Sequence, residues 1–206
     1  MKKRIVCYGD SNTWGYDAIT NGRFSDEVRW TGKLQKKLGT EYTIIEEGLC
    51  GRTAVFEDPL NEGLNGLPYL YPCLMSHGPI DYLVIMLGTN DCKERFSATP
   101  KNIADGIKRL IMKAKHTEDA WRDTPKILVV APAPIEQSHV AGEMGICADK
   151  SKELAVEYQI CAKQYGCDFL DAAPFVKMNE IDFMHLDAKS HERLAEQIAQ
   201  VIRKKV

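Results

Sequence analysis

The sequence predicts an α/β fold, a three-layer α/β/α sandwich built around a five-stranded parallel sheet. Short apolar runs rich in β-branched residues recur between longer amphipathic stretches. The apolar runs are continuous rather than alternating, which is typical of strands that are buried on both faces. Strands that alternate with helices are in turn typical of a parallel sheet covered on both sides. The 206 residues fit one domain, 1–206.

Five apolar runs are the predicted strands. In open parallel sheets, ligands bind beyond the carboxyl ends of the strands, so the residues that follow each run are the first candidates for function. The predicted strands are Arg4–Tyr8, Tyr42–Glu46, Tyr82–Leu87, Lys126–Ala131 and Cys167–Asp171.

Three further segments carry apolar residues at the spacing of one helix face. Thr99 is a suitable N-cap for the first, and Pro100 suits its first helical position. The last helix should begin near Asp187 and end in three basic residues, a charge order that favours the helix dipole. The three faces are Ile103, Ile107, Leu110, Ile111 and Ala114; Leu154, Tyr158, Cys161, Ala162 and Tyr165; and Leu194, Ile198, Val201 and Ile202.

Three connections are predicted to be irregular, namely Asn12–Arg29, Arg52–Pro68 and Pro132–Ile146. They are longer than the usual 2–6 residues of such loops. All three leave the carboxyl edge of the sheet, so they should wall the site or form subunit contacts. We expect a homo-oligomer, because a monomer rarely exposes the amount of apolar surface that lies in or beside these loops. The apolar residues concerned are Trp30, Phe56, Leu60, Leu64 and Leu67.

The composition argues against several classes of partner and cofactor. A net charge of −2 gives no electrostatic footprint for nucleic acid or an anionic membrane. The apolar run after the basic N-terminus is too short for a secretion signal, which favours a cytoplasmic protein. The seven cysteines contain no Cys-x-x-Cys pair, so neither a disulfide framework nor a metal site is indicated. No phosphate-binding glycine motif appears, and no cofactor is expected.

Polar motifs follow four of the five predicted strands. They are Gly9-Asp10-Ser11, Gly48 to Gly51, Gly88 to Asp91, and Asp182 to His185. Each of them is also an ordinary turn composition, and taken singly the turn is the more frequent explanation. One such motif at each of four strand ends, all at one edge of one sheet, is much less expected by chance. The motifs therefore predict a common site.

The residue types at these positions suit acyl transfer through a covalent intermediate. Ser11 lies at a predicted exposed strand-to-helix turn, where a hydroxyl can act as a nucleophile. Asp182 and His185 are spaced so that the carboxylate can orient an imidazole base. The amide of Asn90 can donate to a developing oxyanion, and Gly51 allows a backbone N–H to approach the substrate closely. This chemistry needs no metal.

These motifs resemble the sequence blocks of the SGNH, or GDSL, hydrolase family, and the likeness covers essentially the whole chain. Gly9–Gly15, Val28–Gly32, Ile45–Leu49 and Met86–Asp91 are similar to the bacterial arylesterase/acyltransferase branch in particular. The resemblance implies a flavodoxin-like sheet and an esterase that can also transfer acyl groups to alcohols. It implies a catalytic triad of Ser11, His185 and Asp182, and an oxyanion hole of the Ser11 N–H, the Gly51 N–H and the Asn90 side chain.

One departure from the family concerns Asn12, which replaces the leucine of the commoner Gly-Asp-Ser-Leu form. It places a polar group beside the nucleophile, and we predict that Asn12 contacts substrate. Trp14 either walls the acyl pocket or packs its own loop, and we favour the wall.

The expected substrate is a small carboxylic ester with a short-chain acyl or an aryl group. Asn12 and the acidic pair Glu57-Asp58 leave a carbohydrate O-acetylesterase open as an alternative. A non-catalytic flavodoxin-like binding module is a further one.

Overall fold

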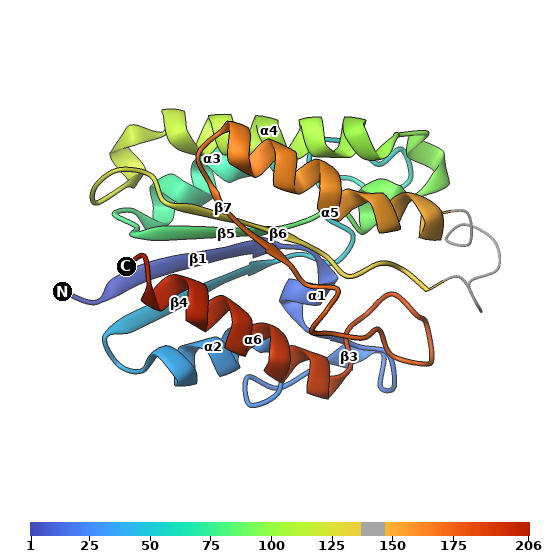
Figure 1. The fold of residues 1–206 in the computed structure, drawn as a ribbon, viewed down its shortest axis with the longest axis horizontal. Coiled ribbons are helices and arrows are strands. Elements are labelled where there is room, and N and C mark those ends of the chain that lie inside the picture. Colours follow the sequence, from blue (N-terminus) through green and yellow to red (C-terminus); the bar gives the residue numbers. More distant parts are fainter. Residues whose placement is uncertain (137–146) are drawn as a thin grey trace.

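The computed structural model describes residues 1–136 and 147–206 and contains a five-stranded parallel sheet between two layers of helices (Figure 1). The strand order is β4-β1-β5-β6-β7, and every neighbouring pair is parallel. The predicted fold class is confirmed, and each predicted strand is found with its ends shifted by two residues at most. The strands are β1 (Lys3–Gly9), β4 (Tyr42–Gly48), β5 (Tyr82–Met86), β6 (Ile127–Ala131) and β7 (Asp168–Asp171).

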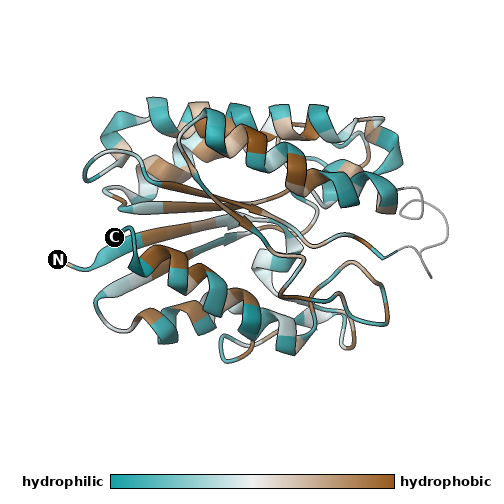
Figure 2. Ribbon diagram, in the orientation of Figure 1, coloured by the Kyte–Doolittle hydropathy of each residue, from teal (hydrophilic) through white to brown (hydrophobic). Residues whose placement is uncertain are grey.

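The helices divide between the two faces of the sheet (Figure 1). On one face, α2 (Trp30–Leu38) packs beside α6 (Ala188–Arg203). On the other face, α4 (Pro100–His116) packs between α3 (Gly66–His77) and α5 (Cys147–Gln164). Figure 2 shows hydrophobic residues on the strands and on the helix sides that face them. None of the helices among the described residues is both long and apolar enough to cross a membrane.

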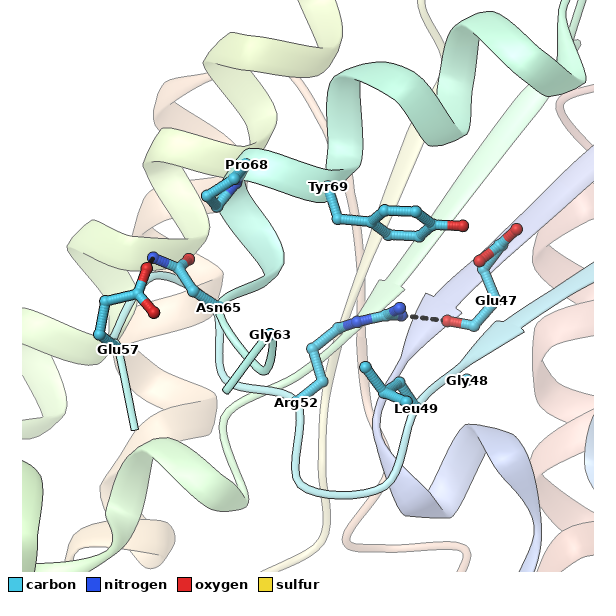
Figure 3. A pocket seen from close by; sticks show the side chains of 9 residues that line it. All are labelled: Glu47, Gly48, Leu49, Arg52, Glu57, Gly63, Asn65, Pro68 and Tyr69. Carbon is cyan, nitrogen blue, oxygen red and sulfur yellow. Dashed lines mark hydrogen bonds between the residues drawn. The ribbon is translucent and has the colours of Figure 1, made fainter. Parts of the chain in front are cut away.

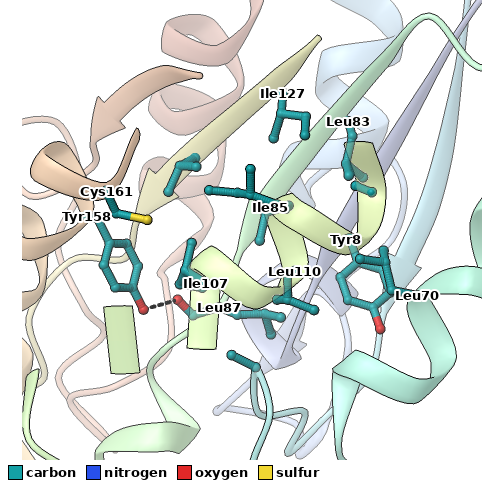
Figure 4. Close-up of a cluster of buried hydrophobic side chains, with 14 of the residues drawn as sticks. Tyr8, Leu70, Leu83, Ile85, Leu87, Ile107, Leu110, Ile127, Tyr158 and Cys161 are labelled. Atoms are coloured by element: carbon teal, nitrogen blue, oxygen red, sulfur yellow. Dashed lines mark hydrogen bonds between the residues drawn. The ribbon is translucent and has the colours of Figure 1, made fainter. Parts of the chain in front are cut away.

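The core has two parts because the strands are buried on both faces. Along β1, Val6 and Tyr8 point to the α3–α5 side, whereas Ile5 and Cys7 point to the α2–α6 side. All four are fully buried, as the continuous apolar pattern predicted. Figure 4 shows the α3–α5 side, where the Tyr158 hydroxyl donates to the carbonyl oxygen of Leu87 at 3.0 Å. That bond satisfies a polar group that would otherwise be costly to bury.

Side-chain caps begin the two most amphipathic helices. The Thr99 side chain accepts the backbone N–H of Asn102 at the start of α4, and Pro100 occupies the first turn. At the start of α6, Asp187 Oδ1 accepts the N–H of Ser190 at 2.6 Å. Both predicted starts are confirmed, because each cap is a local interaction that the sequence displays directly.

Helices α2 and α3 were not predicted. Each contains a residue that ordinarily disfavours a helix, Gly32 in α2 and Pro72 in α3. A Cβ at Gly32 would lie 2.0 Å from the carbonyl oxygen of Asp26, so a close backbone approach requires glycine there. Helix α3 begins at Gly66, within the segment Arg52–Pro68 that was predicted to be irregular.

The segment after β1 also contains more regular structure than predicted. It includes α1 (Ser11–Trp14) and a small antiparallel hairpin of β2 (Tyr16–Asp17) and β3 (Gly22–Arg23). Of the third predicted connection, Pro132–Ile146, residues 137–146 lie outside the described residues.

The functional edge of the sheet follows from its register. Gly9, the last residue of β1, is paired with Gly48 of β4 on one side and with Met86 of β5 on the other. The chain first passes from β1 to β4 and then crosses to β5 on the opposite side, so the strand order reverses at β1. The segments that begin at Asp10, Leu49 and Leu87 therefore leave the same edge at the switch point where α/β sheets bind ligands.

Candidate active site

Ser11 stands at the first position of α1, immediately after β1. Asp10 caps this short helix, because its Oδ1 accepts the N–H of Asn12 at 2.9 Å. Gly15 ends the helix with a φ of +89°, in the left-handed region that favours glycine. The predicted strand-to-helix turn is present, but the expectation that it is exposed was wrong. Ser11 is only 6% exposed because surrounding loops cover it.

A continuous chain of hydrogen bonds joins Ser11, His185 and Asp182. His185 Nε2 lies 2.8 Å from Ser11 Oγ, and His185 Nδ1 lies 2.8 Å from Asp182 Oδ2. Ser11 and His185 are 174 residues apart in the sequence, so only the fold brings them together. These distances suit transfer of the serine proton to the imidazole while the carboxylate holds the other ring nitrogen.

The loop that carries Asp182 and His185 is held by polar side chains of its own. Asn179 Nδ2 donates to Asp182 Oδ1 at 2.9 Å and to the His185 carbonyl oxygen at 2.8 Å. The same Asp182 oxygen accepts the backbone N–H groups of Met184 and His185, both at 3.0 Å. Sequence reasoning missed Asn179. Its spacing of three residues before Asp182 is a recognisable turn signal, although not one that indicates catalysis.

Asn12 links α1 to this loop. Its Oδ1 accepts the N–H of Leu186 at 2.9 Å, and its Nδ2 donates to the carbonyl oxygen of Met184 at 3.2 Å. The residue is 3% exposed. The amide therefore positions the histidine loop against the nucleophile, and the contact of Asn12 with substrate stays a prediction.

Two aromatic residues at the end of α1 and just after it have different surroundings. The ring of Tyr16 lies against the imidazole of His185, with 4.4 Å between ring centroids. Sequence reasoning missed this contact, which depends on the short β2–β3 hairpin. The ring of Trp14 is instead covered by the guanidinium of Arg23 at 5.2 Å, and Arg23 Nε donates to the Trp14 carbonyl oxygen at 2.7 Å. These contacts favour the packing alternative for Trp14.

Gly51 and Asn90 face the site from the neighbouring strands. Gly51 has a φ of +84°, and a Cβ there would lie 2.8 Å from the Leu64 side chain, so the position favours glycine. Within the described residues, no acceptor takes the Gly51 N–H. Asn90 Nδ2 donates to the carbonyl oxygen of Arg52 at 3.2 Å, which fixes the amide and leaves its second hydrogen for another acceptor.

Two buried charged residues secure the loop between Gly48 and Ala54. Asp91 is fully buried, and its Oδ1 accepts the Ala54 N–H at 2.8 Å. Arg52 donates to the carbonyl oxygens of Gly9, at 3.0 Å, and of Glu47. Its guanidinium also lies 4.2 Å from the centre of the Tyr8 ring. Sequence reasoning singled out neither residue, because these contacts join segments that are far apart along the chain.

The carboxyl groups around the site differ in the direction in which their surroundings shift their pKa values. Burial acts to raise the pKa of Asp182, but the hydrogen bond and charge of His185 outweigh it and lower that pKa to about 2. Asp182 is therefore ionised at any working pH and can hold the imidazole. Burial dominates at Asp10 and Asp91 and raises their pKa values to about 6 and about 7.

The known proteins that resemble this chain in sequence or structure include hydrolases and esterases. A model of the GDSL-like lipase/acylhydrolase family matches residues 7–193. No curated protein matches the sequence. Among solved structures, the native aryl esterase of M. smegmatis is 35% identical with a TM-score of 0.93, over 99% of this chain and 100% of that one. A carbohydrate acetylesterase from Sinorhizobium meliloti is 37% identical with a TM-score of 0.94, over 98% and 99% of the two chains.

A third structure, a putative arylesterase from Agrobacterium tumefaciens, is 32% identical with a TM-score of 0.90, over 99% of this chain and 100% of that one. The family match spans most of the sequence, and these similarities extend over nearly the whole length of each protein. The chain therefore belongs to the GDSL-like lipase/acylhydrolase family, and it is a carboxylic ester hydrolase.

Proposed function

We propose that the esterase is a serine hydrolase in which Ser11 is the nucleophile, His185 the general base and Asp182 the group that orients the histidine. The observation that carries this proposal is the unbroken hydrogen-bond chain, with 2.8 Å at each of its two links. The three residues come from the end of β1 and from the loop before α6, and their polar atoms meet at the switch point of the sheet.

In the first step, His185 Nε2 accepts the hydroxyl proton while Ser11 Oγ attacks the ester carbonyl carbon. Asp182 stabilises the imidazolium that results. The negative charge that develops on the carbonyl oxygen is received by the N–H groups of Ser11 and Gly51 and by Asn90 Nδ2. His185 then returns the proton to the leaving alcohol, and the acyl group remains on Ser11.

In the second step, water replaces the alcohol. His185 removes a proton from the water as its oxygen attacks the acyl carbon, and the same donors hold the second oxyanion. Collapse of the intermediate releases the carboxylic acid, and the proton returns to Ser11. Another alcohol can occupy the place of the water, so the mechanism also provides acyl transfer to alcohols. Supplying vinyl acetate with benzyl alcohol and measuring benzyl acetate against acetate tests that transfer.

The experiment that tests the nucleophile is labelling with a fluorophosphonate probe, followed by mass spectrometry of the labelled peptide. One probe per chain on Ser11 is expected, with parallel loss of p-nitrophenyl acetate hydrolysis. Ser11→Ala should lose both the label and the activity while it remains folded by circular dichroism. Turnover near that of the wild type in Ser11→Ala would refute the proposal, and so would a wild type that the probe does not label.

The substrate class divides between aryl esters and acetylated sugars, and one feature favours the second. A cavity of about 680 Å³ borders Gly48 and Leu49, just before Gly51, and it includes the polar residues Glu57 and Asn65 (Figure 3). Asn65 Nδ2 donates to Glu57 Oε1 at 2.7 Å, and Asn65 Oδ1 accepts the Leu67 N–H at 3.0 Å, so the carboxylate of Glu57 is the acceptor available to hydroxyl groups. The two structures with the esterase and acetylesterase names have 35% and 37% identity, which does not discriminate.

A direct comparison of kcat/KM for phenyl acetate and for acetylated xylose decides between the two classes. If the cavity binds a sugar leaving group, Glu57→Ala, which removes the exposed carboxylate and keeps the Asn65 cap of α3, should weaken kcat/KM for the acetylated sugar and leave phenyl acetate almost unchanged. Equal losses on both substrates would count against the sugar.

We also propose that the protein is a homo-oligomer in the cytoplasm. The residues that suggested this are placed differently than expected, since Trp30 is fully buried and Phe56 and Leu67 pack against the core. Large apolar side chains on α3 and in the loop before it are exposed, and a second subunit commonly covers such side chains. They are Leu60, Tyr69, Tyr71 and Met75. Light scattering that gives a 23.2 kDa particle at micromolar concentration would contradict the oligomer.

A further inference from the structure

Helix α3 presents one row of polar side chains to the end of β4. Tyr69, Cys73 and His77 follow one another at four-residue intervals and therefore share one face of the helix. Glu47, the penultimate residue of β4, lies opposite that face, with its Oε1 2.6 Å from His77 Nε2. The possible ligand atoms of Glu47, Cys73 and His77 all lie within 4.8 Å of one another. None of the three takes part in the mechanism above.

We propose that Glu47, Cys73 and His77 form a binding site for Zn²⁺. A thiolate sulfur, an imidazole nitrogen and a carboxylate oxygen are the three donor types that zinc takes from proteins. In a tetrahedral site with bonds of roughly 2.0–2.3 Å, the donor atoms are separated by roughly 3.3–3.8 Å. The three donors are already close to that arrangement, so small side-chain rotations complete it.

The surroundings of the three donors suit a cation. Cys73 is 1% exposed, and the Glu47 side chain is 14% exposed, so the carboxylate has little access to water. The nearby Arg52 donates to the backbone carbonyl oxygens of Gly9 and Glu47. It forms no hydrogen bond with the Glu47 carboxylate. Zinc would compensate the charges of both the carboxylate and the thiolate, and its binding would release the thiol proton.

The site also has an approach from solvent. Three protein ligands leave a fourth position of the tetrahedron for water. Glu47 and Tyr69 both line the cavity beside the Gly48–Arg52 loop, and Figure 3 shows the Tyr69 ring reaching toward the Glu47 carboxylate above Arg52. His77 is partly exposed as well, with 29% of its side chain accessible.

Binding here would join α3 to the end of β4 and would act mainly on stability. Glu47 directly precedes Gly48, which approaches α1 so closely that a Cβ would lie 2.2 Å from the Trp14 backbone nitrogen. A metal at Glu47 thus fixes the strand end from which the Gly51 loop departs. The donors are separate from Ser11, His185 and Asp182, so hydrolysis does not require the metal.

The test uses the full chain after treatment with a chelator, with Co²⁺ as a spectroscopic probe. One equivalent of Co²⁺ should give tetrahedral d–d bands and a thiolate-to-cobalt charge-transfer band, and Zn²⁺ should abolish both. Cys73→Ser should lose the charge-transfer band. His77→Gln should weaken binding by ~100-fold or more, because even groups outside the ligand shell commonly contribute 10–100-fold. The control Cys50→Ser removes an exposed thiol and should leave the spectrum unchanged.

Thermal unfolding gives a second readout that does not depend on activity. Zn²⁺ should raise the Tm of the wild type and of Cys50→Ser but not that of His77→Gln, since a ligand of the native state stabilises it. A wild type without the charge-transfer band, or a band that persists in Cys73→Ser, would overturn the proposal. If Cys73→Ser does not fold, the test uses His77→Gln instead, because His77 is partly exposed. An unchanged Co²⁺ affinity in His77→Gln would also overturn the proposal.

Discussion

The two halves of the active site are built in different ways. The half that holds Asp182 and His185 is a loop organised by neutral amides. Asn179 forms hydrogen bonds within the loop, and Asn12 bonds the loop backbone to α1. Asp182 itself is ionised and paired. Met178 and Leu186 anchor the loop in the core, but the positions of Asp182 and His185 themselves rest on individual polar side chains.

The half that holds Gly51 and Asn90 is built from backbone and buried charge. The fully buried Asp91 and the nearly buried Arg52 fix the loop after β4 against the sheet. Burying the Asp91 carboxylate is unfavourable, and the pKa of this group, which burial raises well above its usual range, reflects that cost.

The comparison suggests that the two halves should respond differently to mutation. Changes in the histidine half should reduce the rate while the global fold survives, because the affected contacts are local. Changes in the oxyanion half should also alter stability and its dependence on pH, because its supports are part of the core. Four substitutions test that distinction, in descending order of their expected effect on the rate.

Asp182→Asn should lower kcat by about 10⁴-fold, since an amide in this position favours the wrong tautomer of the histidine. The fold should persist, because the asparagine oxygen can still accept the N–H groups of Met184 and His185. Stopped-flow assays and thermal unfolding measure the two effects. Glu180→Gln, an exposed carboxylate in the same loop, is the matched control and should be active. A loss of less than tenfold in Asp182→Asn would mean that another group orients the imidazole.

Asn90→Ala should lower kcat by roughly 10²–10³ with little change in KM, as expected for a hydrogen bond made mainly in the transition state. The loss of its bond to the Arg52 carbonyl should also loosen the Gly51 loop. Steady-state kinetics with p-nitrophenyl acetate measures kcat and KM separately. Asn102→Ala, in the capping box of α4, should cost stability without affecting the rate. An increase in KM at constant kcat would instead make Asn90 a ground-state binding residue.

Asn12→Ala should lower kcat by about 10–100-fold, because the Leu186 N–H and the Met184 carbonyl both lose a buried partner at a cost of about 1–3 kcal/mol. The rate of fluorophosphonate labelling should fall in parallel, since the probe also depends on the alignment of Ser11 and His185. If only KM rises and labelling is unchanged, Asn12 contacts substrate, as the sequence had suggested.

The parts of the protein that could be predicted from the sequence are those with local signals. Continuous apolar runs located the five strands, and Thr99 and Asp187 marked two helix starts. Helix α3 was missed because Pro72 contradicts the helical pattern locally, whereas packing of Leu70, Cys73 and Leu74 in the core overrides it.

The residues of the active site fall into the same two groups, those with a local sequence signal and those without one. The motifs with Ser11, Asn90 and His185 could be found because each follows a strand end and has a recognisable composition. The supports could not, because they are interactions between distant segments: Asn12 and Leu186 are 174 residues apart, and Asp91 and Ala54 are 37 apart. No local pattern distinguishes an asparagine that will bond a remote backbone from one that will face solvent.

The smallest effect on the rate is expected for Asp91→Asn, which should instead change how stability depends on pH. The asparagine oxygen can still accept the Ala54 N–H, so we expect kcat to change by less than tenfold. In the wild type, the raised pKa of about 7 means that the folded state binds a proton which the unfolded chain has released. The contribution of Asp91 to stability is therefore lost as the pH rises through 7, by about 1–3 kcal/mol between pH 5 and pH 8. Urea unfolding across that range measures it.

In Asp91→Asn the decline due to Asp91 should disappear. The remaining dependence is then set by Asp10, whose pKa is raised to about 6, and by buried His191, whose pKa burial lowers to about 3 and which therefore stabilises the fold as the pH rises. Asp58 provides the contrasting control. Although burial acts to raise its pKa, the Leu60 N–H and the Arg95 guanidinium, at 2.8 Å, lower it. A carboxyl group with a lowered pKa adds stability above its usual pKa and loses it at acid pH, so Asp58→Asn should be less stable than the wild type at pH 8. If the stability of Asp91→Asn depends on pH in the same way as that of the wild type, Asp91 does not couple the oxyanion half to stability, and the contrast between the two halves would rest on geometry alone.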